Sequence, residues 1–559
     1  MRTPALLLLA AGAAAQADFV SSVVDVPAPT TRYALRDVDG DGRRDLLSID
    51  LAGVALRRLR ADGTFPAADD STLAWPADTV GWSLADLEGD GRTELLLLVE
   101  GRRVLAVRAG ADGVLAAGEP LLEQPGGFLP RGIRRVNFVR DVDGDGRPDL
   151  VLPGNGRFLI HLNRAGGLQP AIPVSFRAEI GLELGDPARL DGRFAQDVQI
   201  PWFQLLDVDG DGDTDLVSQT GDQVQVHLAA PDLPQQPSWS LDLVALRAEL
   251  PAREKVDLDN LLGNIEPQIN WRTADLDGAP PHDLVLQTGG TFRVYAGGST
   301  GPLLDQPTQV LKASGNVLYF LLRDTDADGR PELQLLRAGT VSLGDALRLL
   351  IVPGSLDFDV FSYRDVWGSP EAERGEVFAR RPTARMTVAL RIPALLGFLD
   401  DVEELQDQYE KRLEVPAVNA CLHDDGAFDD VVDVQGDALA FWNAAVPDGF
   451  GTGLVARLKS FDADDLLEAY VARELDSLGD GGRKEISLED IRNLLDTPGW
   501  DLRQAVAGRQ PDATLALAVP GADARLRVED LDGDGRSDLV IIGKGGGEGP
   551  RQVQFLVRR

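Results

Sequence analysis

The chain has 559 residues, of which 90 are acidic and 55 are basic, so its net charge at neutral pH is −35. Nucleic acids and anionic membranes both need a basic surface, so this charge excludes them as expected partners. A single cysteine, Cys421, leaves no intrachain disulfide to stabilise the fold. The length exceeds what one compact core needs, which indicates several domains or an array of repeats.

The first residues have the pattern of a secretory signal. Arg2 precedes the apolar stretch Ala5–Ala14, and Ala15-Gln16-Ala17 provides small residues for cleavage. No other run approaches the roughly 18 apolar residues of a membrane-spanning helix. We therefore expect residues 1–17 to be a signal peptide and the protein to be secreted or otherwise extracytoplasmic, in a periplasm or at a cell surface.

One acidic motif recurs along the chain. Its fullest copy, Asp141-Val-Asp-Gly-Asp-Gly-Arg-Pro-Asp149, carries carboxylates at the first, third, fifth and ninth places, with two glycines among them. Six related copies begin at Asp37, Asp86, Asp207, Asp275, Asp324 and Asp530. Successive copies start 49, 55, 66, 68, 49 and 206 residues apart. A recurring period of this size indicates repeated supersecondary units.

Alternating aspartates in a tight loop suit a hard cation such as Ca²⁺, which takes about six to eight oxygens. The backbone carbonyl of the seventh residue would complete the set. The loop at Asp275 has Ala279 instead of an acid at its fifth place, and Pro280-Pro281 where glycine belongs. We therefore expect it to bind weakly or not at all. We expect about six calcium sites, with these ligands: Asp37, Asp39, Asp41, Arg43 and Asp45; Asp86, Glu88, Asp90, Arg92 and Glu94; Asp141, Asp143, Asp145, Arg147 and Asp149; Asp207, Asp209, Asp211, Asp213 and Asp215; Asp324, Asp326, Asp328, Arg330 and Glu332; Asp530, Asp532, Asp534, Arg536 and Asp538.

Each motif lies between short apolar runs. A run such as Leu318–Leu322 precedes the loop, and a second run, a glycine turn and a third run follow it. Such runs, separated by turn residues, are typical of antiparallel strands. Three or four strands in each unit, repeated seven times, suit a β-propeller, which hides its sheet edges by radial repetition.

The sequence of strand, DxDxDGxxD loop, strand, glycine turn and strand resembles the FG-GAP/VCBS repeats of integrin α-subunit propellers and of many secreted bacterial proteins. The resemblance covers about residues 18–360 and 510–559. It implies an all-β, seven-bladed β-propeller that binds Ca²⁺ in loops on one rim. EF-hands and dockerins are a poorer match because their loop closes at position 12 and continues as a helix.

The resemblance divides the chain. Residues 18–364 are expected to form the first six blades, and 511–559 the last blade. The segment 18–26 belongs to no loop unit, so we expect Phe19–Val26 to pair with the outer strand of the last blade and close the ring. The remaining residues, 365–510, are expected to be an insertion.

The insertion has helical periodicity. Apolar residues recur at alternating three- and four-residue spacings between Leu395 and Leu413, and the pattern returns in Asp462–Leu478. We therefore expect a mainly helical subdomain. The stretch after Asp476 resembles an EF-hand turn, but Gly479 and Arg483 stand at ligand positions. A plain helical turn capped by Ser487 is therefore favoured over a metal site.

No catalytic constellation stands out. The four histidines, His161, His227, His282 and His423, are not paired at the spacing of a zinc site. Cys421 lies only two residues from His423, a poor arrangement for a nucleophile and its base, so we expect a buried thiol. Trp82, Trp202 and Trp271 stand beside or within strands that lead into loops, which favours a place in the core over sugar stacking.

These patterns favour a calcium-binding, non-catalytic binding or adhesion module. The resemblance implies an extracellular glycan or protein as the ligand, and we expect a monomer. Two alternatives stay open. One is a carbohydrate-active enzyme, a polysaccharide lyase or hydrolase built on the same propeller. The other is a purely structural extracellular scaffold.

Overall fold

The computed structural model consists mainly of short β-strands gathered into small sheets. It describes residues 19–26, 32–110, 113–123, 134–135, 138–154, 156–177, 179–183, 195–199, 202–221, 223–230, 232–250, 256–265, 268–370, 372, 375–392, 417–423, 427–446, 483–486, 502–519, 525–543 and 551–559. No helix in this part of the chain is long and apolar enough to span a membrane.

Eight sheets have four or five strands, and we name each after the first residue of its loop. The first four are, with strands in spatial order, the Asp37 sheet (β2 Arg32–Arg36, β3 Asp45–Ile49, β4 Gly53–Arg57, β5 Ser71–Ala74), the Asp86 sheet (β10 Arg134–Arg135, β6 Thr79–Ala85, β7 Glu94–Val99, β8 Arg103–Ala109, β9 Leu115–Glu123), the Asp141 sheet (β11 Val139–Arg140, β12 Asp149–Gly154, β13 Arg157–His161, β16 Ile172–Ser175) and the Asp207 sheet (β19 Trp202–Leu206, β20 Asp215–Thr220, β21 Gln223–His227, β22 Trp239–Asp242).

The other four are the Asp275 sheet (β23 Ile269–Ala274, β24 Asp283–Thr288, β25 Thr291–Tyr295, β26 Gln309–Lys312), the Asp324 sheet (β27 Asn316–Arg323, β28 Glu332–Ala338, β29 Gly354–Tyr363, β30 Ala384–Ile392, β34 Arg483–Ile486), the Cys421 sheet (β31 Val418–Ala420, β32 Asp430–Gln435, β33 Ala438–Trp442, β35 Ala513–Ala516) and the Asp530 sheet (β1 Phe19–Val26, β38 Arg551–Arg558, β37 Asp538–Ile542, β36 Arg525–Glu529). The described strands pair antiparallel except β10 with β6 and β30 with β34.

Smaller elements connect the sheets. They are the hairpins β14–β15 (Asn163–Arg164, Gly167–Leu168) and β17–β18 (Glu179–Glu183, Ala195–Gln199), the helices α1 (Leu243–Ala248), α2 (Leu343–Leu349) and α7 (Leu502–Ala505), and the 3-10 turn η1 (Leu262–Asn264). All three described α-helices are short, so the described part of the chain is all-β in class.

Every large sheet follows one plan. The strand after the loop begins with the loop's last residue, and in β3, β7 and β24 all residues are buried. The next strand alternates, as in β21, where Val224 and Val226 are buried between less buried glutamines. Since side chains of a strand point to opposite faces in turn, a fully buried strand must have protein on both faces.

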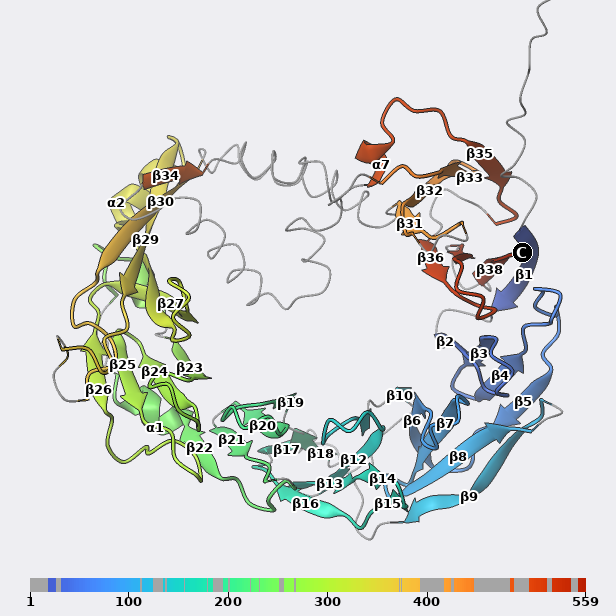
Figure 1. Cartoon of the computed structure of the whole chain (residues 1–559), viewed down its shortest axis with the longest axis horizontal. Helices are drawn as coiled ribbons and strands as arrows, with labels where there is room; N and C mark the ends of the chain where they lie inside the picture. The colour runs from blue at the N-terminus through green and yellow to red at the C-terminus, as the bar shows by residue number, and fades with distance from the viewer. Residues whose placement is uncertain are drawn as a thin grey trace, which may run out of the picture.

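The sheets pack face to face in chain order. Figure 1 shows them following one another along an arc. Seven hydrophobic clusters each join two neighbours: the Cys421 and Asp530 sheets, Asp530 and Asp37, Asp37 and Asp86, Asp86 and Asp141, Asp141 and Asp207, Asp207 and Asp275, and Asp275 and Asp324. Among the described residues no such cluster joins the Asp324 and Cys421 sheets, so closure of the ring stays a prediction.

The N-terminal strand completes the sheet that contains the C-terminal strand. β1 pairs with β38 in antiparallel register from Phe19 opposite Arg558 to Val26 opposite Arg551. Val24 and Val26 are buried in the same cluster as Phe555 and Val557. The strand that has no loop of its own is therefore placed as the sequence predicts.

The number of sheets differs from the sequence-based expectation of seven. The additional one is the Cys421 sheet, whose strands β31, β32 and β33 lie in the range predicted to be helical. Its second strand starts with Asp430-Val-Val, the same acid-and-valine exit as in the other units. The count of seven was too low because Cys421 and His423 stand at the first and third places of this loop and its closing acid comes one residue later.

The prediction of a mainly helical insertion over 365–510 is wrong for the described part of that range, where β30 to β34 are strands and α7 is a short helix. The alternation in Val431-Val-Asp-Val434 satisfies the strand period, which tertiary packing against the Asp530 sheet reinforces. The predicted helices at Leu395–Leu413 and Asp462–Leu478, and the turn around Ser487, fall outside the described residues.

Placing a charge on either face of β1 tests its role in closing the Asp530 sheet. Val24 is 1% exposed in the shared core, whereas the side chain next to it, Val23, is 36% exposed. Val24→Asp should lower the free energy of unfolding by several kcal/mol, because it buries an unpaired carboxylate. Val23→Asp should change it by less than about 0.5 kcal/mol. Thermal unfolding followed by circular dichroism measures both, and equal effects would contradict the pairing.

Candidate metal centres

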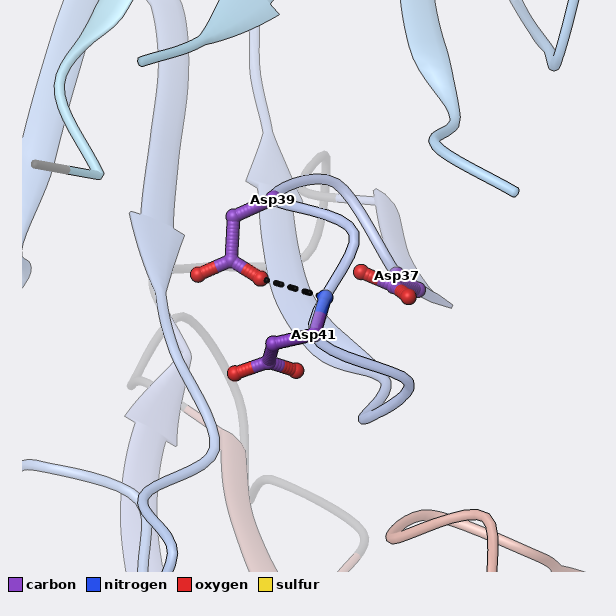
Figure 2. Close-up of side chains that lie close together, drawn as sticks. All are labelled: Asp37, Asp39 and Asp41. Carbon is purple, nitrogen blue, oxygen red and sulfur yellow. Dashed lines mark hydrogen bonds between the residues drawn. The ribbon is translucent and has the colours of Figure 1, made fainter. Parts of the chain in front are cut away.

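The loops fold by hydrogen bonds from backbone N–H groups to their own carboxylates. In the first loop, Asp37 accepts from Gly40 at 2.7 Å and from Gly42 at 2.8 Å, and Asp39 accepts from the N–H of Asp41 at 3.3 Å. Figure 2 shows these three side chains close together, with the bond between Asp39 and Asp41 dashed. Gly42 has a φ of 84°, a left-handed conformation in which a Cβ would be strained, so glycine is required there.

The ninth residue, which we call the closing acid, ties the loop to the sheet. In the Asp141 loop, Asp149 accepts from the N–H of Val142 at 2.7 Å and from that of Asn163 at 2.6 Å. Equivalent pairs of bonds hold Asp45, Asp215, Asp283 and Asp538. The closing acid therefore has a structural role in addition to any role as a ligand.

Burial of the closing acids changes their protonation. It raises the pKa of Asp45 and Asp538 to about 7, and that of Asp215 and Asp283 to about 6, against a partial lowering by the two backbone N–H donors. Burial also raises the pKa of Asp149. A nearby cation would offset this desolvation, because it favours the ionised carboxylate.

Five loops bring three carboxylates together, with one oxygen from each within 4.8 Å of the others. The groups are Asp37, Asp39 and Asp41; Asp141, Asp143 and Asp149; Asp207, Asp209 and Asp215; Asp324, Asp326 and Asp328; Asp530, Asp532 and Asp538. An all-carboxylate donor set suits a hard cation such as Ca²⁺ and not a soft one.

One atom in these groups tests the fit directly. Oδ1 of Asp143 is buried and has no hydrogen-bond donor. A buried carboxylate oxygen without a partner carries a large desolvation cost, and a cation held by Asp141, Asp143 and Asp149 would remove it. The residues of this loop therefore fit the metal that the sequence predicts.

The other expected ligands lie in the same loops but outside these groups. In four loops the arginine at the seventh place, whose backbone carbonyl was the expected ligand, pairs through its side chain with the acid at the fifth place of the same loop. Arg330 reaches Asp328 at 3.2 Å and Arg92 reaches Asp90 at 3.9 Å. Arg43 pairs with Asp41 and Arg536 with Asp534 in the same way. The remaining predicted ligands outside the five groups are Asp45, Asp145, Arg147, Asp211, Asp213, Glu332 and Asp534, together with Asp86, Glu88, Asp90 and Glu94 of the Asp86 loop.

Two loops are not among the converging groups of the described residues. The loop at Asp275 is one, in agreement with its sequence, which has Ala279 at the fifth place where the other loops have an acid. The loop at Asp86 is the other, although its sequence predicts a site. Its two glutamates contact Arg108, whose guanidinium lies 2.8 Å from Glu88 and 3.3 Å from Glu94.

The Cys421 sheet has an eighth loop that sequence reasoning missed. Its closing acid is Asp430, which accepts from the N–H of Leu422 at 2.9 Å and from that of Ala444 at 3.0 Å, as the closing acids of other loops do. Cys421 stands at the first place and the spacing is one residue longer. The apolar run Val431-Val432 directly after an aspartate was the signal that could have revealed it.

Neighbouring loops are linked by hydrogen bonds from the eighth residue of one loop to a carbonyl of the loop before it. Arg44 donates to Leu531 at 2.6 Å, and Thr93 to Asp37 at 2.7 Å. His282 donates to Asp209 at 2.7 Å, and Ser537 to Cys421 at 2.8 Å. These bonds place the loops of the Cys421, Asp530, Asp37 and Asp86 sheets side by side, and likewise those of the Asp207 and Asp275 sheets. We call the edge of the sheets that carries the loops the loop rim.

The cysteine and two of the histidines are buried in the sheets. Cys421 is buried, and its thiol donates to the carbonyl oxygen of His423 at 3.3 Å. The ring of His161 lies 2.9 Å from the carbonyl of Gln169, and burial lowers the pKa of His227 to about 4. Trp82 is buried as expected. Trp271 packs edge-on to Trp239 in the core of the Asp207 and Asp275 sheets, and the side chain of Trp202 is outside the described part.

The raised pKa values of the closing acids predict how the metal-free protein responds to pH. Asp45 and Asp538 have unfolded values near 3.8 and folded values near 7, so folding takes up protons between these limits. The free energy of unfolding should therefore fall as pH rises from 5 to 8 in calcium-free buffer. His161 and His227, whose pKa burial lowers, act in the opposite direction below the ordinary value of 6.5, but they are two groups against four closing acids.

Melting temperatures across this pH range, in calcium-free buffer, measure the effect. Asp538→Asn should reduce the slope, since an amide cannot titrate. A melting temperature that rises steadily from pH 5 to 8 without metal would contradict the assignment of buried, protonatable closing acids.

Comparison with known proteins supports the repeat. The family model of the FG-GAP-like repeat matches residues 37–97, the Asp37 loop through β7, and this confirms the resemblance to FG-GAP repeats. No curated protein matches the chain.

Several solved structures show a local likeness. An Agrocybe aegerita lectin that recognises non-reducing terminal N-acetylglucosamine has 18% identity and a TM-score of 0.26, over 56% of this chain and 78% of that one. A protein from Lactobacillus plantarum has 14% identity and a TM-score of 0.23, over 63% and 86%. The Vibrio cholerae biofilm matrix protein Bap1 has 10% identity and a TM-score of 0.22, over 96% and 87%. Scores this low carry no argument about the present chain.

Proposed function

We propose that the protein is a secreted, calcium-stabilised propeller of FG-GAP-like repeats that acts as a non-catalytic binding or adhesion module. The observation that carries the proposal is the convergence of three carboxylates in each of five loops. The FG-GAP-like repeat at residues 37–97 is consistent with a binding module. The ligand would be an extracellular glycan or protein, bound by a monomer.

Calcium would act on the fold, and the fold would present the binding surface. Extracellular calcium modules bind at about 10⁻⁴–10⁻³ M, so millimolar calcium adds roughly 0.4–1.4 kcal/mol per site by mass action. Five such sites would contribute several kcal/mol, comparable with the net stability of a domain. Because neighbouring loops are hydrogen-bonded, each filled site would also hold the edge of the next sheet.

The non-catalytic interpretation is supported by the state of the reactive groups. Cys421 and His227 are buried within sheets, and the thiol of Cys421 donates to a backbone carbonyl. The acids of the rim are arranged around shared points, a pattern suited to holding cations. These features favour a binding module over the polysaccharide lyase or hydrolase and over an inert scaffold.

Substitution of the acid at the third place in two loops tests the calcium sites. Asp143 belongs to a converging group and has an unpartnered buried oxygen, whereas Asp277 stands at the same place in the loop that lacks a fifth acid. Asp143→Ala should lower the number of bound calcium ions by one and reduce the calcium-induced rise in melting temperature. Asp277→Ala should do neither. Isothermal titration calorimetry gives the stoichiometry, and equal losses in both variants would refute the graded assignment.

A glycan array and a panel of extracellular matrix proteins test the binding role. The calcium-loaded protein should bind at least one class of ligand, and binding should weaken after EGTA treatment because the sheets loosen at the rim. Incubation of polysaccharides with the protein should release no reducing ends and no unsaturated products. Product release would establish the enzyme alternative, and an absence of binding on both panels would favour the scaffold.

A further inference from the structure

We propose that the Asp86 loop binds no cation because Arg108 takes its place: the guanidinium pairs with both Glu88 and Glu94 and holds the loop closed. The proposal concerns a loop whose sequence predicts a metal site. It rests on the proposed cation sites of the other loops only for its comparison, since the contacts of Arg108 stand independently.

The loop itself is folded like its relatives. Asp86 accepts from Gly89 at 2.7 Å and from Gly91 at 2.8 Å, as Asp37 does from the matching glycines. Glu94 accepts from the N–H of Leu87 at 3.0 Å, the first of the two bonds that a closing acid makes. The difference therefore lies in the carboxylates and their partners, not in the backbone of the loop.

The second bond of the closing acid identifies what Arg108 replaces. In five other units this bond comes from a backbone N–H fourteen residues after the closing acid: Leu59, Asn163, Ala229, Gly297 and Ala444. Arg108 stands at the same place after Glu94, but it donates with its side-chain Nε, at 3.3 Å. The longer glutamate is thus reached by a side chain where aspartate is reached by the backbone.

The same guanidinium also donates to Glu88, the acid at the third place of the loop. Its second nitrogen donates to Glu88 at 2.8 Å, so one cation bridges the two glutamates that should have been ligands. Arg58 and Arg164 contact Asp39 and Asp143, at the third place of their own loops, at 3.4 Å and 3.3 Å. Within the described residues, no hydrogen bond or ion pair joins either arginine to a closing acid. Their loops keep converging carboxylates, and the Asp86 loop does not.

Charge accounts for why the substitution is stable. The side chain of Glu94 is only 4% exposed, and a buried carboxylate needs a cation or several donors near it. In the other loops a metal ion can supply that charge only when calcium is present. Arg108 is covalently part of the chain, so it supplies the charge at any calcium concentration. The Asp86 sheet would therefore keep its rim in order when the others lose theirs.

Hydrogen exchange of the full-length protein, read for each loop with calcium and with EGTA, tests the proposal. In the wild type, residues 86–94 should exchange equally in both conditions, apart from Thr93, whose N–H donates to the Asp37 loop, while 141–149 should exchange about tenfold faster or more in EGTA. In Arg108→Gln, residues 86–94 should also become fast in EGTA. Arg102→Gln, which removes a surface pairing of the same sheet with Glu100 and Glu123, should leave residues 86–94 unchanged.

The number of bound calcium ions provides a second test of the proposal. Glu88→Gln should leave the number of bound calcium ions unchanged, because the proposal places no ion in this loop. Loss of one ion in Glu88→Gln would overturn it, and so would unchanged exchange of residues 86–94 in Arg108→Gln. If no loop of the wild type responds to EGTA, the calcium sites of the proposed function fail, while a fast 86–94 segment in Arg108→Gln would still support Arg108.

Discussion

A buried carboxylate at the junction of loop and sheet is the interaction on which each unit depends. One of its oxygens accepts from the second residue of the loop, and in most units the other accepts from the strand that returns beside it. This pair of bonds fixes the loop against two strands at once. It also places a negative charge where water cannot reach, so each unit needs a source of compensation. The acids of the loop make this need greater, because they repel one another.

The units meet the need in different ways. Five loops gather further carboxylates around a point that a divalent cation can occupy. The Asp86 unit brings in a guanidinium, the Asp275 unit has one acid fewer, and the Cys421 unit has a cysteine in place of its first acid. The hydrogen bonds between neighbouring loops then pass the order of one unit to the next. In such an array, stability is a sum of unit terms and neighbour terms, so individual units can lose their metal site without loss of the fold.

Much of the fold could be predicted because each repeat is marked by residues that lie close together in the sequence. The spacing from Asp141 to Asp149 and the apolar exit that follows define loop and strand together, and Phe19–Val26 was identified by lacking such a loop. The eighth sheet could not be found this way, since Cys421 replaces the first acid and the loop is one residue longer. Its one sequence signal was the apolar run Val431-Val432 after Asp430, and packing against the Asp530 sheet supports the assignment.

The site was predictable to a similar extent. In five of the loops that the motif marks, three carboxylates converge, and the loop at Asp275, expected to be weak because of Ala279, is not among those groups of the described residues. The motif could not reveal that Arg108, fourteen residues beyond Glu94, would reach back to the loop, because that contact depends on strand register. Nor could it show that the arginine at the seventh place would pair with the fifth acid, which depends on a rotamer.

Anomalous diffraction from crystals of the full-length protein grown with a lanthanide that substitutes for calcium tests the central claim most directly. The account predicts one peak in each loop beginning at Asp37, Asp141, Asp207, Asp324 and Asp530, and none in the loops beginning at Asp86, Asp275 and Cys421. A peak between Glu88 and Glu94, or an empty Asp141 loop, would contradict it.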